Sequence, residues 1–199
     1  MPSPMSSSSG KAQTGGTRQS WARSWALATL MTGVTILSAQ FSVTIPPTPV
    51  PLTLQVFAVL LTGLVLGRRW SLVAQAQYLV LGAVGLPVFA KAGFGLPTLF
   101  GLTGGYLLSY PFAAFVVGWI AGRAGNEGAT LRHQILGCAA GLAIVYGLGC
   151  AWFAAAMHAS LLAVVLPGAL IFLAWDSVKA VAAVAVAQGI GAARARTGR

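Results

Sequence analysis

The only aspartate of the chain, Asp176, lies three residues before a lysine, Lys179, within a long apolar stretch. Residues at positions i and i+3 share a face of a helix, so the sequence WDSVK predicts an acid and a base side by side. A charge at membrane depth costs at least about 2.5–3.5 kcal/mol, so we expect the pair to face a bundle interior. Three interpretations stay open: an ion pair that only holds helices together, a Lys179 side chain that snorkels to an interface, or a polar anchor in which Lys179 binds the carboxylate of a solute.

Further polar residues accompany two other apolar stretches. Thr53 and Gln55 stand where a helix is expected to begin, and a helix start offers free N–H groups and a positive dipole end. They either bind a solute amide or carboxylate or, for Thr53, cap the helix. Gln75, Gln77 and Tyr78 lie in the next stretch, where hydrogen bonds between helices explain them as well as a ligand does.

Sequence patterns of the familiar catalytic sites are absent from the chain. It contains no Gly-x-x-x-x-Gly-Lys-Ser/Thr, no His-Glu-x-x-His, no nucleophile elbow and no pair of carboxylates. Cys138 and Cys150 are separated by about 18 Å of expected helix, too far for a disulfide, and show no metal spacing. We therefore expect no enzyme activity, no cofactor and no metal, and any uphill transport would draw energy from a partner or an ion gradient.

The composition indicates a membrane protein. Hydrophobic residues make up 57% of the 199 residues and charged residues only 7%, against about 25% charged residues in soluble domains. We expect an all-α polytopic protein, a bundle of six transmembrane helices with extracellular loops over a solute pocket. The expected spans are residues 25–43, 52–67, 71–86, 105–122, 133–156 and 170–191, with a tight polar break at the sequence GRRW between the second and third.

Positive charge is distributed unevenly between the gaps. With an inside N-terminus, the cytoplasmic set is Lys11, Arg18, Arg23, Arg68, Arg69, Arg123, Arg132, Arg194, Arg196 and Arg199, while Lys91 alone lies outside. We therefore expect a multi-pass protein of the cell (cytoplasmic) membrane with both termini cytoplasmic. The net charge of +10 does not indicate nucleic-acid binding, because the basic residues flank apolar runs, where anionic headgroups of the lipid bilayer attract them. We divide the chain into a disordered N-terminal tail (1–20), the membrane domain (21–193) and a basic C-terminus (194–199).

The two predicted outer loops have unusual compositions. Residues 44–55 carry four prolines, which predicts a stiff, extended segment that lies in water or folds over the bundle. Residues 85–106 are rich in glycine and aromatic residues and too apolar to be disordered. We expect them to form a lid over a pocket, lined by Phe89, Phe94, Phe100 and Tyr106.

Four motifs occur in a fixed order along the chain: PVPLTLQ (49–55), GAVGLPVFA (82–90), GLTGGYLLSY (101–110) and the acid-x-x-Lys of WDSVK. Together they resemble the BioY family, the biotin-binding S components of energy-coupling-factor (ECF) transporters, and the resemblance covers roughly residues 25–190. The chain departs from the family pattern at Leu102, where the family usually has proline, and at Ala174-Trp175, where it often has Pro-Gly.

The resemblance implies high-affinity biotin capture near the outer face, together with a transmembrane coupling subunit and two ATPase subunits as partners. Biotin would be a transported ligand and no cofactor. The substrate-binding residues expected on this basis are Asp176, Lys179, Thr53, Gln55, Phe89, Thr103, Gly104 and Tyr106. Small-residue pairs in the first helix, Ala28 with Thr32 and Thr29 with Gly33, resemble the family's docking surface for the coupling subunit.

Three alternatives remain at this point. The first is an S component for another small vitamin. The second is an intramembrane enzyme that uses Asp176 as an acid or base, and the third is a channel or proton-relay protein built on Asp176 and Lys179. A continuous polar path would favour the channel, and the sequence shows only scattered glutamine, threonine and tyrosine residues.

Overall fold

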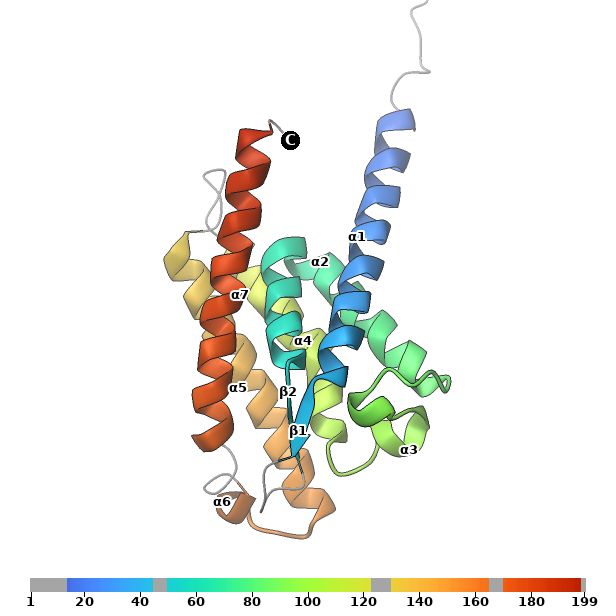
Figure 1. Ribbon diagram of the computed structural model, residues 1–199, viewed down its shortest axis with the longest axis vertical. Coiled ribbons are helices and arrows are strands. Elements are labelled where there is room, and N and C mark those ends of the chain that lie inside the picture. The colour runs from blue at the N-terminus through green and yellow to red at the C-terminus, as the bar shows by residue number, and fades with distance from the viewer. Residues whose placement is uncertain (1–13, 45–49, 123–129, 165–169, 198–199) are drawn as a thin grey trace, which may run out of the picture.

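The computed structural model describes residues 14–44, 50–122, 130–164 and 170–197. Five long helices dominate this part of the chain (Figure 1). They are α1 (Thr14–Gln40), α2 (Gln55–Ala83), α4 (Gly104–Ala121), α5 (Leu131–Ala156) and α7 (Leu170–Arg196). The short elements are β1 (Ser42–Thr44), β2 (Pro51–Thr53), the 3-10 helix η1 (Ala90–Ala92), α3 (Gly95–Leu99) and α6 (Leu161–Val164).

Helix α2 reverses its direction at Gly67. This residue has φ 70° and ψ 179°, a conformation that glycine adopts without the penalty that a Cβ brings. The first arm of α2 rises from β2 and the second arm descends on the other side of the turn (Figure 1). The two arms correspond to the predicted spans 52–67 and 71–86, although α2 begins at Gln55 and ends at Ala83. The polar break predicted between the spans is this turn.

The six-helix architecture is therefore confirmed, with α1, the two arms of α2, α4, α5 and α7 as its helical segments. Four helices in the described part of the chain are long and apolar enough to cross a membrane: α2, α4, α5 and the Phe172–Arg196 part of α7. Helix α1 is not among them.

Two helices extend past their expected ends. Helix α1 begins at Thr14, so residues 14–20 are helical where the sequence predicted a disordered tail, and α7 runs to Arg196, into the predicted C-terminal segment. Adding a residue to an existing helix costs far less than starting one, so polar residues can continue an apolar helix. Residues 1–13, which belong to the predicted tail, and residues 123–129, between the fourth and fifth expected spans, lie outside the described residues.

The proline-rich segment contributes a short antiparallel hairpin. Strands β1 and β2 pair Ser42 with Thr53, Val43 with Leu52 and Thr44 with Pro51. Proline is tolerated at such a strand end because no further ladder hydrogen bond is needed there. The hairpin joins the end of α1 to the start of α2, and so fixes the position of Thr53.

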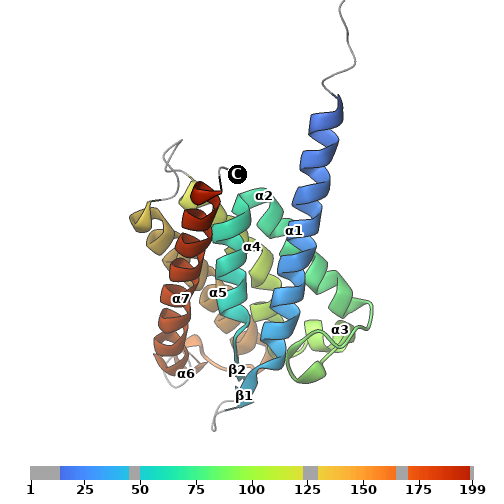
Figure 2. The same cartoon turned by 45° about the horizontal axis from the view of Figure 1, so that its top comes forward.

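Close helix contacts depend on glycine at a few positions. A Cβ at Gly118 of α4 would lie 2.5 Å from the backbone carbon of Gly67 and 2.6 Å from the amide nitrogen of Arg68. Helix α4 therefore crosses the turn of α2 backbone to backbone, as small residues allow in membrane bundles. The α2 turn, the start of α1 and the end of α7 share one end of the molecule, and the hairpin, α3 and α6 lie at the other (Figures 1 and 2).

Candidate functional site

A cavity of about 130 Å³ lies at the hairpin end of the bundle. One water needs roughly 10–15 Å³, so the cavity has room for a small organic molecule. Most of its wall is apolar or aromatic, with a few polar groups, which is typical of small-molecule sites. Its lining residues are Val50, Pro51, Leu52, Thr53, Gln55, Val56, Phe89, Ala90, Thr98, Thr103, Tyr106, Leu107, Tyr110, Val145, Tyr146, Phe172, Asp176 and Lys179.

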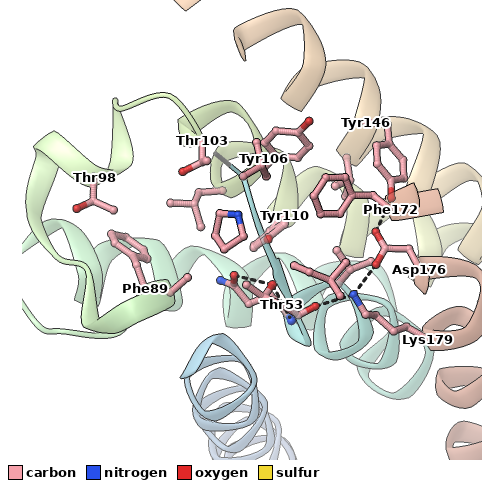
Figure 3. A pocket seen from close by; sticks show the side chains of 18 residues that line it. Thr53, Phe89, Thr98, Thr103, Tyr106, Tyr110, Tyr146, Phe172, Asp176 and Lys179 are labelled. Atoms are coloured by element: carbon pink, nitrogen blue, oxygen red, sulfur yellow. Dashed lines mark hydrogen bonds and ion pairs between the residues drawn. The ribbon is translucent and has the colours of Figure 1, made fainter. Parts of the chain in front are cut away.

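Asp176 and Lys179 form an ion pair in this wall. The Lys179 Nζ donates to Asp176 Oδ1 over 2.6 Å, and both residues are buried, at 8% and 4% exposure for Lys179 and Asp176 respectively. The i, i+3 spacing thus places the two side chains together, as predicted. Figure 3 shows them with Tyr146 on one side of the cavity, while Phe89 and Thr98 lie on the opposite side.

The ion pair is tied to two other elements. Lys179 Nζ also donates to the carbonyl oxygen of Thr53 over 2.6 Å, and the Tyr146 hydroxyl donates to Asp176 Oδ2 over 2.6 Å. Burying a charge is costly unless it is paired and hydrogen-bonded, and both groups meet this condition. An ammonium group has three donors, so these two bonds leave Lys179 one further N–H for a ligand acceptor.

A hydrogen-bond chain runs from the cavity to the loop that follows α2. The Thr53 hydroxyl lies 3.0 Å from Gln55 Oε1, and Gln55 Nε2 lies 2.6 Å from the Tyr78 hydroxyl. That hydroxyl in turn donates to the carbonyl oxygen of Val88 over 3.3 Å. The backbone N–H of Gln55 donates to the Thr53 hydroxyl over 3.3 Å, so Thr53 also accepts from the first N–H of α2. Polar groups of the cavity and of the loop are thereby linked.

The predicted lid over the pocket is only partly lined as expected. Phe89 is 1% exposed and its ring contacts that of Tyr78 edge to face, with centroids 5.4 Å apart. Phe94 and Phe100 are each 58% exposed and do not line the cavity, so the prediction for these two was wrong. Phe94 and Phe100 flank a short helix, α3, which residue composition alone did not reveal.

Tyr106 and Thr103 line the cavity, whereas Gly104 does not. Gly104 is buried behind the wall, where a Cβ would collide with the carbonyl oxygen of Leu99 and come within 3.3 Å of the Trp152 indole nitrogen. Glycine is therefore needed there for packing, and a substrate-binding role for Gly104 stays a prediction. The other seven predicted residues all line the cavity.

The sequence reasoning missed two tyrosines of the wall, Tyr110 and Tyr146. Tyr110 follows Tyr106 by four residues, which places both on one face of α4, and this spacing was a usable signal. Tyr146 has no such signal, since its bond to Asp176 joins residues thirty positions apart on different helices.

The glutamines of the second arm of α2 bond to neighbouring helices. Gln75 Nε2 donates to the hydroxyls of Thr35 and Thr62 over 3.1 and 3.4 Å. Thr32 Oγ1 lies 2.9 Å from Gln77 Oε1. Neither glutamine lines the cavity, so the interpretation as hydrogen bonds between helices holds for both.

The small residues of α1 divide between two environments. Ala28 and Thr32 are buried, and Thr32 Oγ1 lies 2.8 Å from the carbonyl oxygen of Ala74, so this pair packs against α2. Thr29 is exposed, and a Cβ at Gly33 would meet nothing within 4 Å. A docking role for the Thr29 and Gly33 pair stays a prediction.

Metal ligands do not cluster within the described ranges. No group of three or more histidine, cysteine, aspartate or glutamate side chains comes together in that part of the chain. Cys138 and Cys150 are both buried free thiols of α5.

Comparison with known proteins gives concordant matches. The model of the BioY family matches residues 6–196. A probable biotin transporter BioY of Pyrococcus horikoshii is 37% identical over 169 residues, which cover 84% of this chain and 95% of the relative. A biotin transporter BioY of Thermotoga maritima is 42% identical over 120 residues, covering 60% and 68% of the two chains.

A solved structure shares the fold. The crystal structure of the S-component for biotin from an ECF-type ABC transporter superposes with a TM-score of 0.81. The match covers 90% of this chain and 94% of that one, at 22% sequence identity.

Proposed function

Because this chain belongs to the BioY family, we propose that it is the high-affinity biotin-binding subunit of an ECF-type transporter and serves biotin uptake across the cytoplasmic membrane. The observation that carries the proposal is the buried Asp176–Lys179 pair in the wall of an otherwise largely apolar cavity. Ionisable residues within membrane spans mark solute sites more often than they serve packing alone.

The groups of the cavity are complementary to biotin. Biotin carries a valerate carboxylate, two ureido N–H donors, one ureido carbonyl and an apolar bicyclic body. We assign the carboxylate to the remaining N–H of Lys179, with Asp176 holding the ammonium in place through its 2.6 Å contact. Phe89, Tyr106 and Tyr110 would enclose the apolar body, and the polar groups of Thr53 and Gln55 are the nearest candidates for the ureido ring.

The distribution of charge supports an orientation with cytoplasmic termini. Arg68 and Arg69 lie at the α2 turn and Arg194 and Arg196 at the end of α7, all at one end of the molecule (Figure 1). Lys91 of η1 belongs to the opposite end, near α3. Positively charged segments remain in the cytoplasm, so the cavity would open toward the outside.

Transport against a gradient requires a source of energy that this chain does not encode. The family is one of transporter subunits, so we propose no covalent chemistry for Asp176. A transmembrane coupling subunit and two ATPase subunits would supply the energy. The proposed contact with the coupling subunit is the pair of exposed Thr29 and half-buried Gly33, where a Cβ would meet nothing within 4 Å.

The test is equilibrium binding of radiolabelled biotin to the detergent-purified chain, with a panel of other vitamins as competitors. The proposal predicts saturable binding of one biotin per chain that the other vitamins do not displace. Displacement by a different vitamin would assign the cavity to that vitamin. A folded parent protein that binds no biotin would refute the proposal.

A further inference from the structure

Three tryptophans gather where α1 passes the turn of α2. The ring of Trp70 lies edge to face against Trp21 and Trp25, with centroids 5.7 and 5.5 Å apart. Trp21 and Trp25 are nevertheless 62% and 48% exposed. An open groove, which we call the tryptophan groove, is lined by these residues and by Ser20, Ser24, Arg69 and Val73.

The groove contains a cation that the described part of the chain does not neutralise with a carboxylate. Arg69 lines it, and both Arg69 and the preceding Arg68 are exposed. Asp176 is the one acidic residue in the described ranges, and it is bound to Lys179 in the cavity at the other end of the bundle. An anion from outside the described chain would therefore complement Arg69.

The position of the groove along the bundle indicates which anion this is. It lies at the end of the bundle that carries the α2 turn and the helix termini, and α1 extends beyond that turn (Figures 1 and 2). Tryptophan is enriched at the level of lipid headgroups, and basic side chains there attract anionic lipids. Guanidinium groups also bind phosphate through two parallel N–H donors.

We propose that the tryptophan groove binds one anionic phospholipid of the adjacent leaflet. The lipid phosphate accepts from the Arg69 guanidinium, and the part of an acyl chain nearest the headgroup packs against Trp25 and Val73. An uncharged indole wall beside one guanidinium suits a molecule with an anionic head and an apolar tail. The site is separate from the ligand cavity, which lies at the opposite end of the bundle.

The test is native mass spectrometry of the detergent-purified chain with phosphatidylglycerol and phosphatidylcholine of identical acyl chains. We expect the parent protein to retain phosphatidylglycerol preferentially. Arg69→Gln should weaken that retention about fivefold, the factor that corresponds to the roughly 1 kcal/mol of one arginine at an anionic surface. Arg132→Gln is the matched control, because Arg132 is exposed on α5 and does not line the groove.

A second variant separates the groove from surface charge in general. Trp25→Leu keeps every charge but removes one wall, and it should also weaken phosphatidylglycerol retention. Equal retention of the two lipids by the parent, or an equal loss in Arg69→Gln and Arg132→Gln, would overturn the proposal. Normal lipid retention by Trp25→Leu would also overturn the proposal. The same holds if Arg69→Gln retains lipid normally but fails to bind a purified coupling subunit, because the groove would then be a protein contact. Unchanged melting temperature and elution volume establish that each variant is folded.

Discussion

Replacing Lys179 by alanine should weaken binding of biotin more than binding of a biotin ester. In the proposed complex, the ammonium of Lys179 donates its remaining N–H to the valerate carboxylate. The same ammonium is already held by Asp176 Oδ1 and by the Thr53 carbonyl oxygen, both at 2.6 Å. Its position is thus fixed before the ligand arrives, so little side-chain entropy is lost on binding.

The expected magnitudes follow from the charge of the acceptor. A hydrogen bond to a charged group contributes about 1.5–3 kcal/mol, so the biotin Kd should rise roughly 13- to 160-fold in Lys179→Ala. An ester carbonyl also accepts from the charged ammonium but carries no charge of its own, so this bond is weaker and the ester Kd should rise less than the biotin Kd. The quantity to be tested is the ratio of the two losses.

The assay is competition of biotin and biotin methyl ester against radiolabelled biotin on the parent and variant proteins. Lys91→Ala is the matched control, because Lys91 is an exposed lysine near α3 at the same end of the bundle and does not line the cavity. We expect it to leave both affinities unchanged. Equal losses for acid and ester in Lys179→Ala would remove the carboxylate from Lys179, and no loss for either would make the ion pair purely structural.

Three further outcomes test the packing and the hydrogen-bond chain. Lys179→Ala alone strands a buried carboxylate and should cost about 3–5 kcal/mol, whereas Asp176→Asn with Lys179→Met should recover most of the thermal stability without restoring biotin binding; a double variant as unstable as the single one would contradict this. Gly118→Ala pushes a Cβ into the backbone at the α2 turn and should lower the melting temperature by an amount equivalent to about 1–3 kcal/mol, while Gly122→Ala meets nothing within 4 Å and should be neutral; similar melting temperatures would refute the close crossing. Tyr78→Phe removes the hydroxyl that links the Gln55 side chain to the carbonyl oxygen of Val88 in the lid, so amide hydrogen exchange in residues 84–94 should accelerate. Unchanged exchange would show that other contacts hold the lid.

The sequence by itself determined the class of protein and the local features of the site. Long apolar runs with few charges require a membrane bundle, because their backbone groups must be satisfied within helices. The reversal at Gly67 was visible as a polar break, and the Asp176–Lys179 pair follows from helical geometry over three residues. The ordered motifs were sufficient to indicate the family, because the identity and order of motifs can be read along the chain without knowing how the helices pack.

Only the tertiary structure decided which distant residues share the cavity. The contact of Lys179 with the Thr53 carbonyl spans 126 positions, and that of Tyr146 with Asp176 spans thirty. The exposure of Phe94 and Phe100 was likewise decided by the tertiary structure, since both belong to a segment rich in aromatic residues from which the sequence predicted a cavity lining. Periodicity specifies the face of a helix on which a residue lies, but the neighbour of that face is set by how all six segments pack, which no local pattern encodes.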